Sequence, residues 1–429
     1  MEGLRGLTSF FQVDKRLEDR SRRAMEQIAG RFAAIDEVTE YNQQKVLRAF
    51  IDHGVSETHF APTTGYGYGD RGRDTLDKVF AQVMGAEDAL VRHSIVSGTH
   101  AITIALSGVL RPGDTLLAAT GAPYDTLEEV IGIRGDASGS LKDFGIAYRQ
   151  VDLKDGRPDI PGVVAALTDD VKMVHIQRSR GYDPRPSLSV EEIGRIIRAV
   201  RQKRPDVIVF VDNCYGEFVE PTEPTQVGAD LMAGSLIKNP GGGIAENGGY
   251  LCGRADLIEQ CAFRMTTPGL GREVGASLGH NRSLFMGLFH APHVVGEALK
   301  TAVYTAALFG GLGFAVSPTA GEPRADIIQT VCLGTPEGLV AFCQGMQKGA
   351  PVDAFVTPEP WDMPGYEDPV IMAAGAFTMG ASIELSADGP LREPYAAYMQ
   401  GGLNFHSGKV GVLLAAQSML EQGALEGKL

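Results

Sequence analysis

The strongest constraint on this chain is a pair of polar residues that follow two apolar segments. The run Val207–Val211 is apolar throughout and ends at Asp212. Twenty-six residues later, the segment Gly234-Ser235-Leu236-Ile237 leads to Lys238, and a glycine-rich turn follows. In open parallel sheets, ligands bind beyond the carboxyl ends of the strands. We therefore expect the carboxylate and the lysine to lie at one edge of a sheet.

This pairing is what a pyridoxal 5'-phosphate (PLP) site requires. A lysine amine bonds to the aldehyde of that cofactor, and an aspartate pairs with its pyridinium nitrogen. The opposite charge would hold Asp212 ionised. Burial lowers the pKa of a lysine, so we expect Lys238 to be a neutral nucleophile. Taken singly, Asp212 could be a turn residue or helix cap, and Lys238 could be a surface lysine. The prediction of a PLP site therefore depends on the two residues together.

Bulk composition excludes several classes of protein. The net charge is −14, with 53 acidic and 39 basic residues, which argues against nucleic-acid binding. No apolar run reaches about 18 residues, so no transmembrane helix is expected, and the N-terminus lacks the pattern of a signal peptide. Five scattered cysteines without a CxxC motif are typical of a reduced, cytoplasmic protein. His290 and His293 are three residues apart, but no third ligand stands nearby, so no metal is predicted.

A chain of 429 residues predicts two or three domains. We expect a helical arm at 1–58, with one or two amphipathic helices over 14–52, a large α/β domain at 59–295 and a smaller α+β domain at 296–429. Apolar runs alternate with helical stretches in the large domain and predict a largely parallel sheet covered on both faces. Its candidate strands are Ala89–His93, Thr115–Ala119, Met173–Gln177, Val207–Asp212, Leu231–Ile237 and Gly249–Cys252. Further along, we expect a helix from 285 to 311 that Pro292 breaks, and later runs at Asp326–Leu333 and Ser382–Leu385.

The phosphate of the cofactor needs a backbone cradle. Ser97-Gly98-Thr99-His100 follows the first predicted strand and opens a helix, and N–H groups at such a turn favour an anion. A plain helix cap is the ordinary alternative. Ser97, Gly98 and Thr99 are therefore candidate phosphate ligands, with Ser235 as a further hydroxyl donor. Tyr124 follows another strand and is a candidate to stack on the pyridine ring, or else a core tyrosine.

Longer motifs surround these residues, and through them the chain resembles the methionine gamma-lyase-like, or aluminium-resistance, family of fold-type I PLP enzymes. The motifs are Gly65–Tyr68, Ser97–Ile102, Pro123–Val130, Gln177–Tyr182, Val211–Glu217, Gly234–Gly243 and Gly389–Arg392. The resemblance implies a mostly parallel seven-stranded sheet flanked by helices, with a smaller C-terminal domain. It also implies a homotetramer built from tight dimers.

The resemblance implies roles for further residues. Tyr68 would reach the phosphate of the neighbouring subunit, although Asp70 stands where better-known relatives carry an arginine. Ser179 would lie at the cofactor where those relatives have an asparagine. Arg392 is the preferred anchor for the carboxylate of the substrate, and Arg180 and Arg178 are alternatives, for which a structural ion pair is an equal reading.

The predicted function is therefore that of a PLP-dependent carbon–sulfur lyase, with Lys238, Asp212 and Tyr124 as catalytic residues. β-Elimination and γ-elimination both remain open, as do methionine, cystathionine, cysteine or another amino acid as substrate. Amino-acid aldol cleavage, γ-replacement, transamination or non-catalytic PLP binding would use the same scaffold. A nicotinamide-dependent dehydrogenase is disfavoured, because no GxGxxG motif opens a helix after the first strand.

Overall fold

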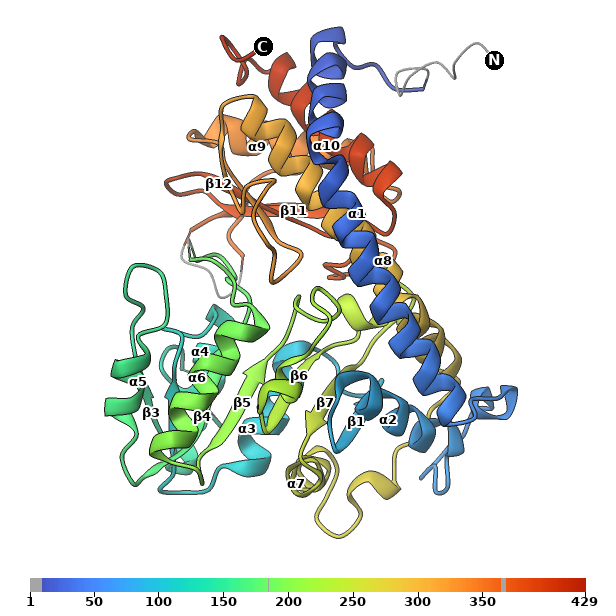
Figure 1. The fold of residues 1–429 in the computed structure, drawn as a ribbon, viewed down its shortest axis with the longest axis vertical. Helices are drawn as coiled ribbons and strands as arrows, with labels where there is room; N and C mark the ends of the chain where they lie inside the picture. The colour runs from blue at the N-terminus through green and yellow to red at the C-terminus, as the bar shows by residue number, and fades with distance from the viewer. Residues whose placement is uncertain (1–9, 137, 184, 364–367) are drawn as a thin grey trace. The chain divides into compact units, whose positions relative to one another are not determined.

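The computed structural model describes residues 10–136, 138–183, 185–363 and 368–429. The chain forms two compact units. The larger unit is Glu40–Pro292, and the smaller one combines residues before Glu40 with those from His293 onward. Helices α1 (Lys15–Asp52) and α8 (Asn281–Gly311) each contribute residues to both units. Figure 1 shows the elements along the chain.

The larger unit is built on a seven-stranded sheet in the order β1-β7-β6-β5-β4-β2-β3. The neighbouring strands from β3 to β6 pair in parallel, while β7 runs antiparallel to both β6 and β1. The strands are β1 (Asp88–Arg92), β2 (Thr115–Ala118), β3 (Ala147–Gln150), β4 (Val171–Gln177), β5 (Ile208–Asp212), β6 (Leu231–Ser235) and β7 (Gly249–Gly253). This is the mostly parallel sheet that the sequence predicted.

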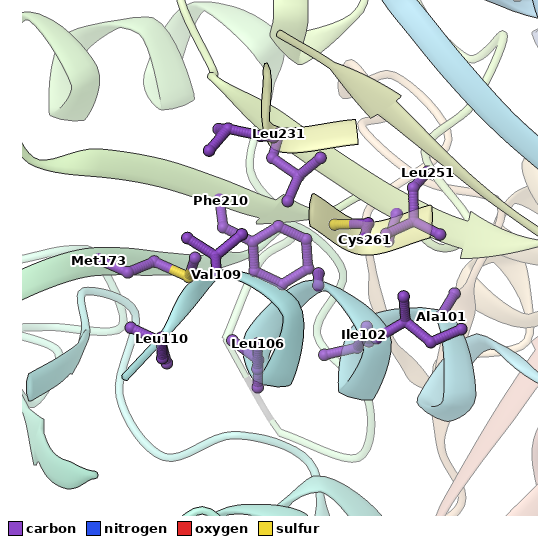
Figure 2. Packing of buried hydrophobic residues seen from close by; sticks show 14 of the residues in the cluster. Ala101, Ile102, Leu106, Val109, Leu110, Met173, Phe210, Leu231, Leu251 and Cys261 are labelled. Carbon is purple, nitrogen blue, oxygen red and sulfur yellow. The ribbon is translucent and has the colours of Figure 1, made fainter. Parts of the chain in front are cut away.

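Helices cover the sheet on both faces. They are α2 (Arg71–Met84), α3 (Gly98–Val109), α4 (Asp125–Ile131), α5 (Ile160–Ala166), α6 (Val190–Lys203) and α7 (Ala255–Met265), with short 3-10 turns between elements. Every residue of β5 is buried, as expected of a strand covered on two sides. Its residues Ile208 and Phe210 belong to the apolar core that α3 and α7 share. Figure 2 shows Phe210 of β5 and Val109 of α3 next to each other in this core, which also contains Leu231 and Leu106.

The smaller unit holds a five-stranded antiparallel sheet in the order β10-β11-β12-β9-β8. Its strands are β8 (Ala315–Ser317), β9 (Gln329–Cys332), β10 (Val370–Ala374), β11 (Ser386–Pro390) and β12 (Ala396–Gln400). Helices α9 (Pro336–Lys348) and α10 (Phe405–Glu421) pack against each other, and α9 also contacts the sheet. No helix in the described parts of the chain is both long and apolar enough to cross a bilayer.

Several elements differ from the sequence predictions. Strand β3 was missed because its residues Ala147–Gln150 are polar and partly exposed at the edge of the sheet. Helix α8 continues through Pro292 rather than breaking there. The sequence pattern predicts a helix that begins near Thr75, but α2 begins at Arg71, because Asp70 caps it by accepting a hydrogen bond from the backbone N–H of Arg73. The run Ser382–Leu385 is a turn that precedes β11.

Candidate active site

The predicted residues of the larger unit lie at the ends of its central strands. Asp212 is the last residue of β5, and Ser235 is the last residue of the neighbouring parallel strand β6. Lys238 follows three residues later and precedes the 3-10 turn η5 (Asn239–Gly241). Asp212 pairs in register with Ala233 of β6. The fold therefore brings the carboxylate and the lysine to one edge of the sheet.

The carboxylate of Asp212 is buried and accepts a hydrogen bond of 3.1 Å from the backbone N–H of Cys214. Burial raises the pKa of Asp212, while the charge of Lys238 and the Cys214 N–H act in the opposite direction. A buried carboxylate is costly to ionise unless a positive partner stands close. The Asp212 site is therefore suited to a cationic group.

Lys238 differs from the sequence expectation in its protonation. Burial lowers its pKa, but the acidic groups of Cys214, Tyr215, Asp212 and Tyr124 around it act in the opposite direction, and the net pKa is raised. Burial also raises the pKa of the Cys214 thiol well above its usual value, so at neutral pH this thiol carries no charge. Asp212 is then the neighbour that keeps the lysine charged. The prediction of a neutral amine was wrong for the protein on its own.

Tyr215 forms a platform for this lysine. The ammonium nitrogen of Lys238 lies 4.0 Å from the centre of the Tyr215 ring, well within the range of a cation–π interaction. Tyr215 adopts a positive φ of 72°, a conformation that costs energy for a residue other than glycine and often marks a functional site. The turn after Asp212 therefore supplies both the carboxylate and the surface beneath the lysine.

The Ser97-Gly98-Thr99 turn opens α3. Ser97 caps the helix, because its hydroxyl accepts a hydrogen bond of 3.0 Å from the backbone N–H of His100. A Cβ atom on Gly98 would lie 3.2 Å from Sγ of Cys214 and 3.6 Å from Cβ of Ser235. Gly98 and Ser235 are thus neighbours, beside the residue that binds Asp212. The free N–H groups of the twelve-residue helix α3 are suited to hold a phosphate.

Tyr124 joins this group from the end of the loop after β2. Its hydroxyl donates a hydrogen bond of 2.9 Å to Oγ1 of Thr99, and its backbone N–H donates one of 3.0 Å to Oε1 of Gln177. Burial raises the pKa of the Tyr124 phenol, and the charge of Asp212 adds to this effect. The phenol is therefore neutral at neutral pH and remains a hydrogen-bond donor.

Ser179 and Arg180 follow β4, and both are buried. The backbone of this segment is tied to the site, because Arg178 N–H donates to the carbonyl of Asp212 over 3.1 Å. The carbonyl of Ser179 accepts hydrogen bonds from Gln177 and Arg185, at 3.1 and 2.6 Å. Both residues are therefore held near the end of β5.

Arg178 is enclosed by protein groups. Its guanidinium is fully buried and forms ion pairs with Glu220 at 2.6 Å and Glu223 at 3.6 Å. It also donates to Oδ1 of Asn213 over 2.8 Å. A Cβ atom on Gly216 would lie 2.5 Å from this side chain. These contacts favour the structural ion pair over a substrate contact, and the guanidinium braces the turn that carries Asp212.

The last two predicted site residues, Tyr68 and Arg392, lie in different surroundings. The ring of Tyr68 is exposed and stacks on Tyr66, with 5.5 Å between ring centres. Asp70, at the position where better-known relatives carry an arginine, caps α2 and accepts a hydrogen bond of 3.1 Å from the side-chain amide of Asn281. Arg392 belongs to the smaller unit, where it is exposed and pairs with Asp368 at 3.2 Å.

Sequence reasoning missed three residues that contact the predicted ones. They are Tyr215 beneath Lys238, Cys214 on Asp212, and Gln177 on the backbone of Tyr124. The first two lie within the motif that contains Asp212, and Gln177 ends a predicted strand. Their positions at strand ends were the available signal.

The described residues fit PLP. The helix that begins at Gly98, with Ser235 beside it, can bind a phosphate. The buried carboxylate of Asp212 needs a positive partner. Lys238 has the neutral phenol of Tyr124 close by. These groups correspond in kind to the phosphate, pyridinium and aldehyde of the cofactor.

The fold is that of fold-type I PLP-dependent enzymes. The fold is shared with the Escherichia coli pyridoxal-5'-phosphate dependent protein YhfS, with a TM-score of 0.60 at 19% identity over 90% of this chain and 97% of that one. That likeness concerns the fold alone.

The model of the methionine gamma-lyase family matches residues 17–420, and the chain belongs to this family. The uncharacterised Bacillus subtilis protein YnbB is 56% identical over 397 residues, 92% of this chain and 94% of its own length. A solved carbon-sulfur lyase involved in aluminum resistance from Clostridium novyi NT is 51% identical, with a TM-score of 0.91 over 94% of this chain and 96% of that one. A Listeria monocytogenes structure, named as a candidate cystathionine beta-lyase involved in aluminum resistance, is 52% identical. It has a TM-score of 0.92 over 94% of this chain and 99% of its own.

Proposed function

We propose that this chain is a PLP-dependent lyase that breaks a carbon–sulfur bond of an amino acid by β- or γ-elimination. The observation that carries the proposal is the arrangement of Asp212 and Lys238 at the ends of adjacent strands, beside the Gly98 turn. Family membership and the carbon-sulfur lyase from Clostridium novyi NT support the reaction class. The Listeria monocytogenes relative supports cystathionine as one substrate to test.

The cofactor would be held by residues already described. Lys238 would carry it through its amine, Asp212 would face its ring nitrogen, and Ser97, Gly98, Thr99 and Ser235 would hold the phosphate. Tyr124 would lie against the ring, and Ser179 would stand at the end of β4 beside it. When bound, PLP withdraws electrons from the α-carbon of an amino acid and so stabilises the carbanion left by proton removal.

Within this arrangement, Lys238 is the group that moves the proton. The free amine of Lys238 would accept the α-proton of the substrate as general base. The Tyr215 ring holds the amine in place from below. Asp212 would keep the ring nitrogen of PLP charged, because a buried carboxylate stabilises a cation at that position. Tyr124 is neutral and donates a hydrogen bond to Thr99, so its phenol would lie against the ring without adding a negative charge.

A guanidinium would bind the carboxylate of the substrate. Arg392 remains the preferred anchor, because a planar guanidinium binds a carboxylate through two parallel hydrogen bonds. Its present partner Asp368 is partly exposed, so a substrate carboxylate could displace it at low cost. Arg180 is the second candidate, since it is buried close to the end of β4.

The assembly we propose is a homotetramer of tight dimers in the cytoplasm. The exposed Tyr66–Tyr68 stack supports a role for Tyr68 in a neighbouring subunit, because two adjacent exposed aromatic rings form a surface that a second copy of the chain would cover. Sedimentation of the purified protein tests the oligomeric state directly.

The function is tested by measuring turnover by the purified protein. Lys238→Ala is the active-site variant, and Lys172→Ala is the surface control. Lys172 lies on β4 and is exposed. We expect the native protein to be yellow and to release ammonia, a keto acid and a thiol from cystathionine, cysteine or methionine. The Lys238→Ala protein should lose the yellow band and this activity. Amino-group transfer to an added keto acid without thiol release would instead establish transamination, and a yellow protein without any turnover would establish a carrier.

A further inference from the structure

Glu217 is a buried acid on the turn that begins at Asp212. Its side chain is fully buried, and Oε1 accepts a hydrogen bond of 2.7 Å from the Tyr250 hydroxyl of β7. Its other oxygen, Oε2, finds no hydrogen-bond partner among the described residues. A Cβ atom on Gly234 of β6 would lie 2.5 Å from Oε1 and 2.8 Å from the Tyr250 hydroxyl. Glycine at 234 therefore leaves the room that this pair occupies.

Glu217 is linked to Lys238 through Asn239, the residue that follows the lysine in the chain. The side-chain amide of Asn239, which directly follows Lys238, donates a hydrogen bond of 3.0 Å to the backbone carbonyl of Glu217. Asn239 is itself fully buried. Two residues before Glu217, the Tyr215 ring lies beneath the Lys238 ammonium. The turn Tyr215–Glu217 therefore contacts both Lys238 and the residue after it. The buried side chain of Glu217 fixes the end of this turn.

The charged and titratable groups that face Glu217 come from strand β7 and from the segments that follow β5 and β6. They are Tyr250 and Cys252 of β7, Lys238 after β6, Cys214 after β5, and Glu223 in the same connection as Glu217. No ion pair to Glu217 is present among the described residues. Burial raises the pKa of Glu217 to about 8, the Tyr250 hydrogen bond and Lys238 lower it, and the charge of Glu223 raises it.

We propose that Glu217, kept as a neutral acid against Tyr250, is a positioning residue for Lys238, and that the loss of its proton sets the alkaline limit of the reaction. The proposal rests on the function proposed above. An ionised Glu217 would place a second negative charge near Lys238, in addition to Asp212. That charge favours the ammonium form of the lysine and so withholds the free amine that accepts the α-proton.

The protonation state can be measured without activity. The infrared difference between wild-type apoprotein and its Glu217→Gln variant should contain the carbonyl band of a protonated carboxylic acid at neutral pH. This band should disappear with a midpoint near the pKa of about 8. A Tyr250→Phe variant removes a hydrogen bond that stabilises the ionised form, so its midpoint should move upward. Tyr304→Phe, which removes a similar buried tyrosine–serine bond at 2.7 Å, is the control and should leave the midpoint unchanged.

Stability of the apoprotein gives a second readout. Because the pKa of Glu217 is raised from 4.5 to about 8, its contribution to stability is present below pH 4.5 and is lost as the pH rises to about 8. The Glu217→Gln variant has no carboxyl group at this position, so it does not lose this stability as the pH rises. Its melting temperature, relative to wild type, should therefore rise across the same window.

The effect of Glu217 ionisation on the reaction is measured in each protein as the ratio of kcat/KM below and above the midpoint. In the wild type, kcat/KM should fall about tenfold over the two pH units around the Glu217 midpoint, as expected for one ionisation. This fall should be absent from Glu217→Gln and displaced upward in Tyr250→Phe. An alkaline limb that is unchanged in both variants would overturn the positioning role, as would an infrared spectrum with no protonated acid. If the protein has no lyase activity at all, the infrared and melting results still decide the state of Glu217.

Discussion

The ammonium nitrogen of Lys238 lies 4.0 Å from the centre of the Tyr215 ring. Tyr215 reaches this position only because its backbone adopts a positive φ of 72°. The residue that follows is Gly216, and a larger side chain there would collide with Arg178. The lysine, its aromatic platform and the buried arginine therefore form one connected structure, in which each residue depends on the shape of the next.

Replacement of Tyr215 tests this contact. Tyr215→Leu removes the ring, and a cation–π interaction in a partly buried site is worth about 1–2 kcal/mol. We expect kcat to fall by about tenfold, because the amine loses its preferred position. Tyr215→Phe keeps the ring and should retain more activity than the leucine variant. Equal activity in both variants would show that the ring does not hold the lysine.

Replacement of Asp212 tests the electrostatic role of the buried carboxylate. Asp212→Asn keeps the shape and can still meet the Cys214 N–H, which lies 3.1 Å from Oδ1, but it cannot hold a pyridinium charged. We expect kcat/KM to fall by roughly a thousandfold, as for other lost electrostatic groups in enzyme sites. Asp206→Asn, at an exposed aspartate before β5, is the matched control. A near-normal rate for Asp212→Asn would remove this residue from the mechanism.

Replacement of Gly98 tests the cradle at the start of α3. A methyl group there would lie 3.2 Å from Sγ of Cys214, which is closer than an ordinary contact. We expect Gly98→Ala to weaken binding of added PLP to the apoprotein about tenfold, while the melting temperature of the apoprotein changes little. Gly30→Ala, at an exposed helical glycine with open space around it, leaves the site untouched and should bind PLP as the wild type does. Loss of affinity in both variants would argue against a specific cradle.

Arg178 offers a test of stability. The guanidinium pairs with Glu220 and Glu223, both partly or fully buried. Removal of one partner from a buried ion pair costs about 3–5 kcal/mol, since the remaining charge stays buried. Arg178→Met should lower the free energy of unfolding by this amount in denaturant titrations. If it instead raised KM for the amino acid with unchanged stability, Arg178 would be a substrate ligand after all.

The pH dependence of stability has a second source in His175. Burial lowers the pKa of this imidazole from 6.5 to about 4. Its contribution is therefore present above pH 6.5 and is lost as the pH falls towards 4. Over this window, wild type should lose roughly 3 kcal/mol relative to His175→Leu, using 1.36 kcal/mol per pKa unit. Parallel stability curves for the two proteins would mean that the imidazole is protonated in the folded state.

The sequence was informative where apolar runs met polar residues. Buried strands such as Val207–Asp212 carry their own pattern, and the position of Asp212 at a strand end followed from it. Strand β3 could not be recognised in this way, since an edge strand exposes its side chains and shows no apolar run. The position of Tyr215 depends on a backbone conformation that no pattern of residue types encodes.

Protonation was harder to anticipate than position. Burial alone predicts a neutral Lys238, but Asp212 stands close enough to reverse the effect. The same applies to Arg178, for which the sequence left an ion pair and a substrate contact equally open. Its partners Glu220 and Glu223 lie more than forty residues away in the chain. Such pairings depend on the tertiary fold, and single-sequence reasoning does not supply them.

The most direct test of the account is to locate the cofactor on the chain. Purified protein reduced with borohydride and digested with trypsin should yield one peptide that carries a pyridoxyl group, and fragmentation should place that group on Lys238. The yellow band should vanish on reduction, together with the activity. A pyridoxyl group on another lysine, or an unmodified chain from protein saturated with PLP, would contradict the account.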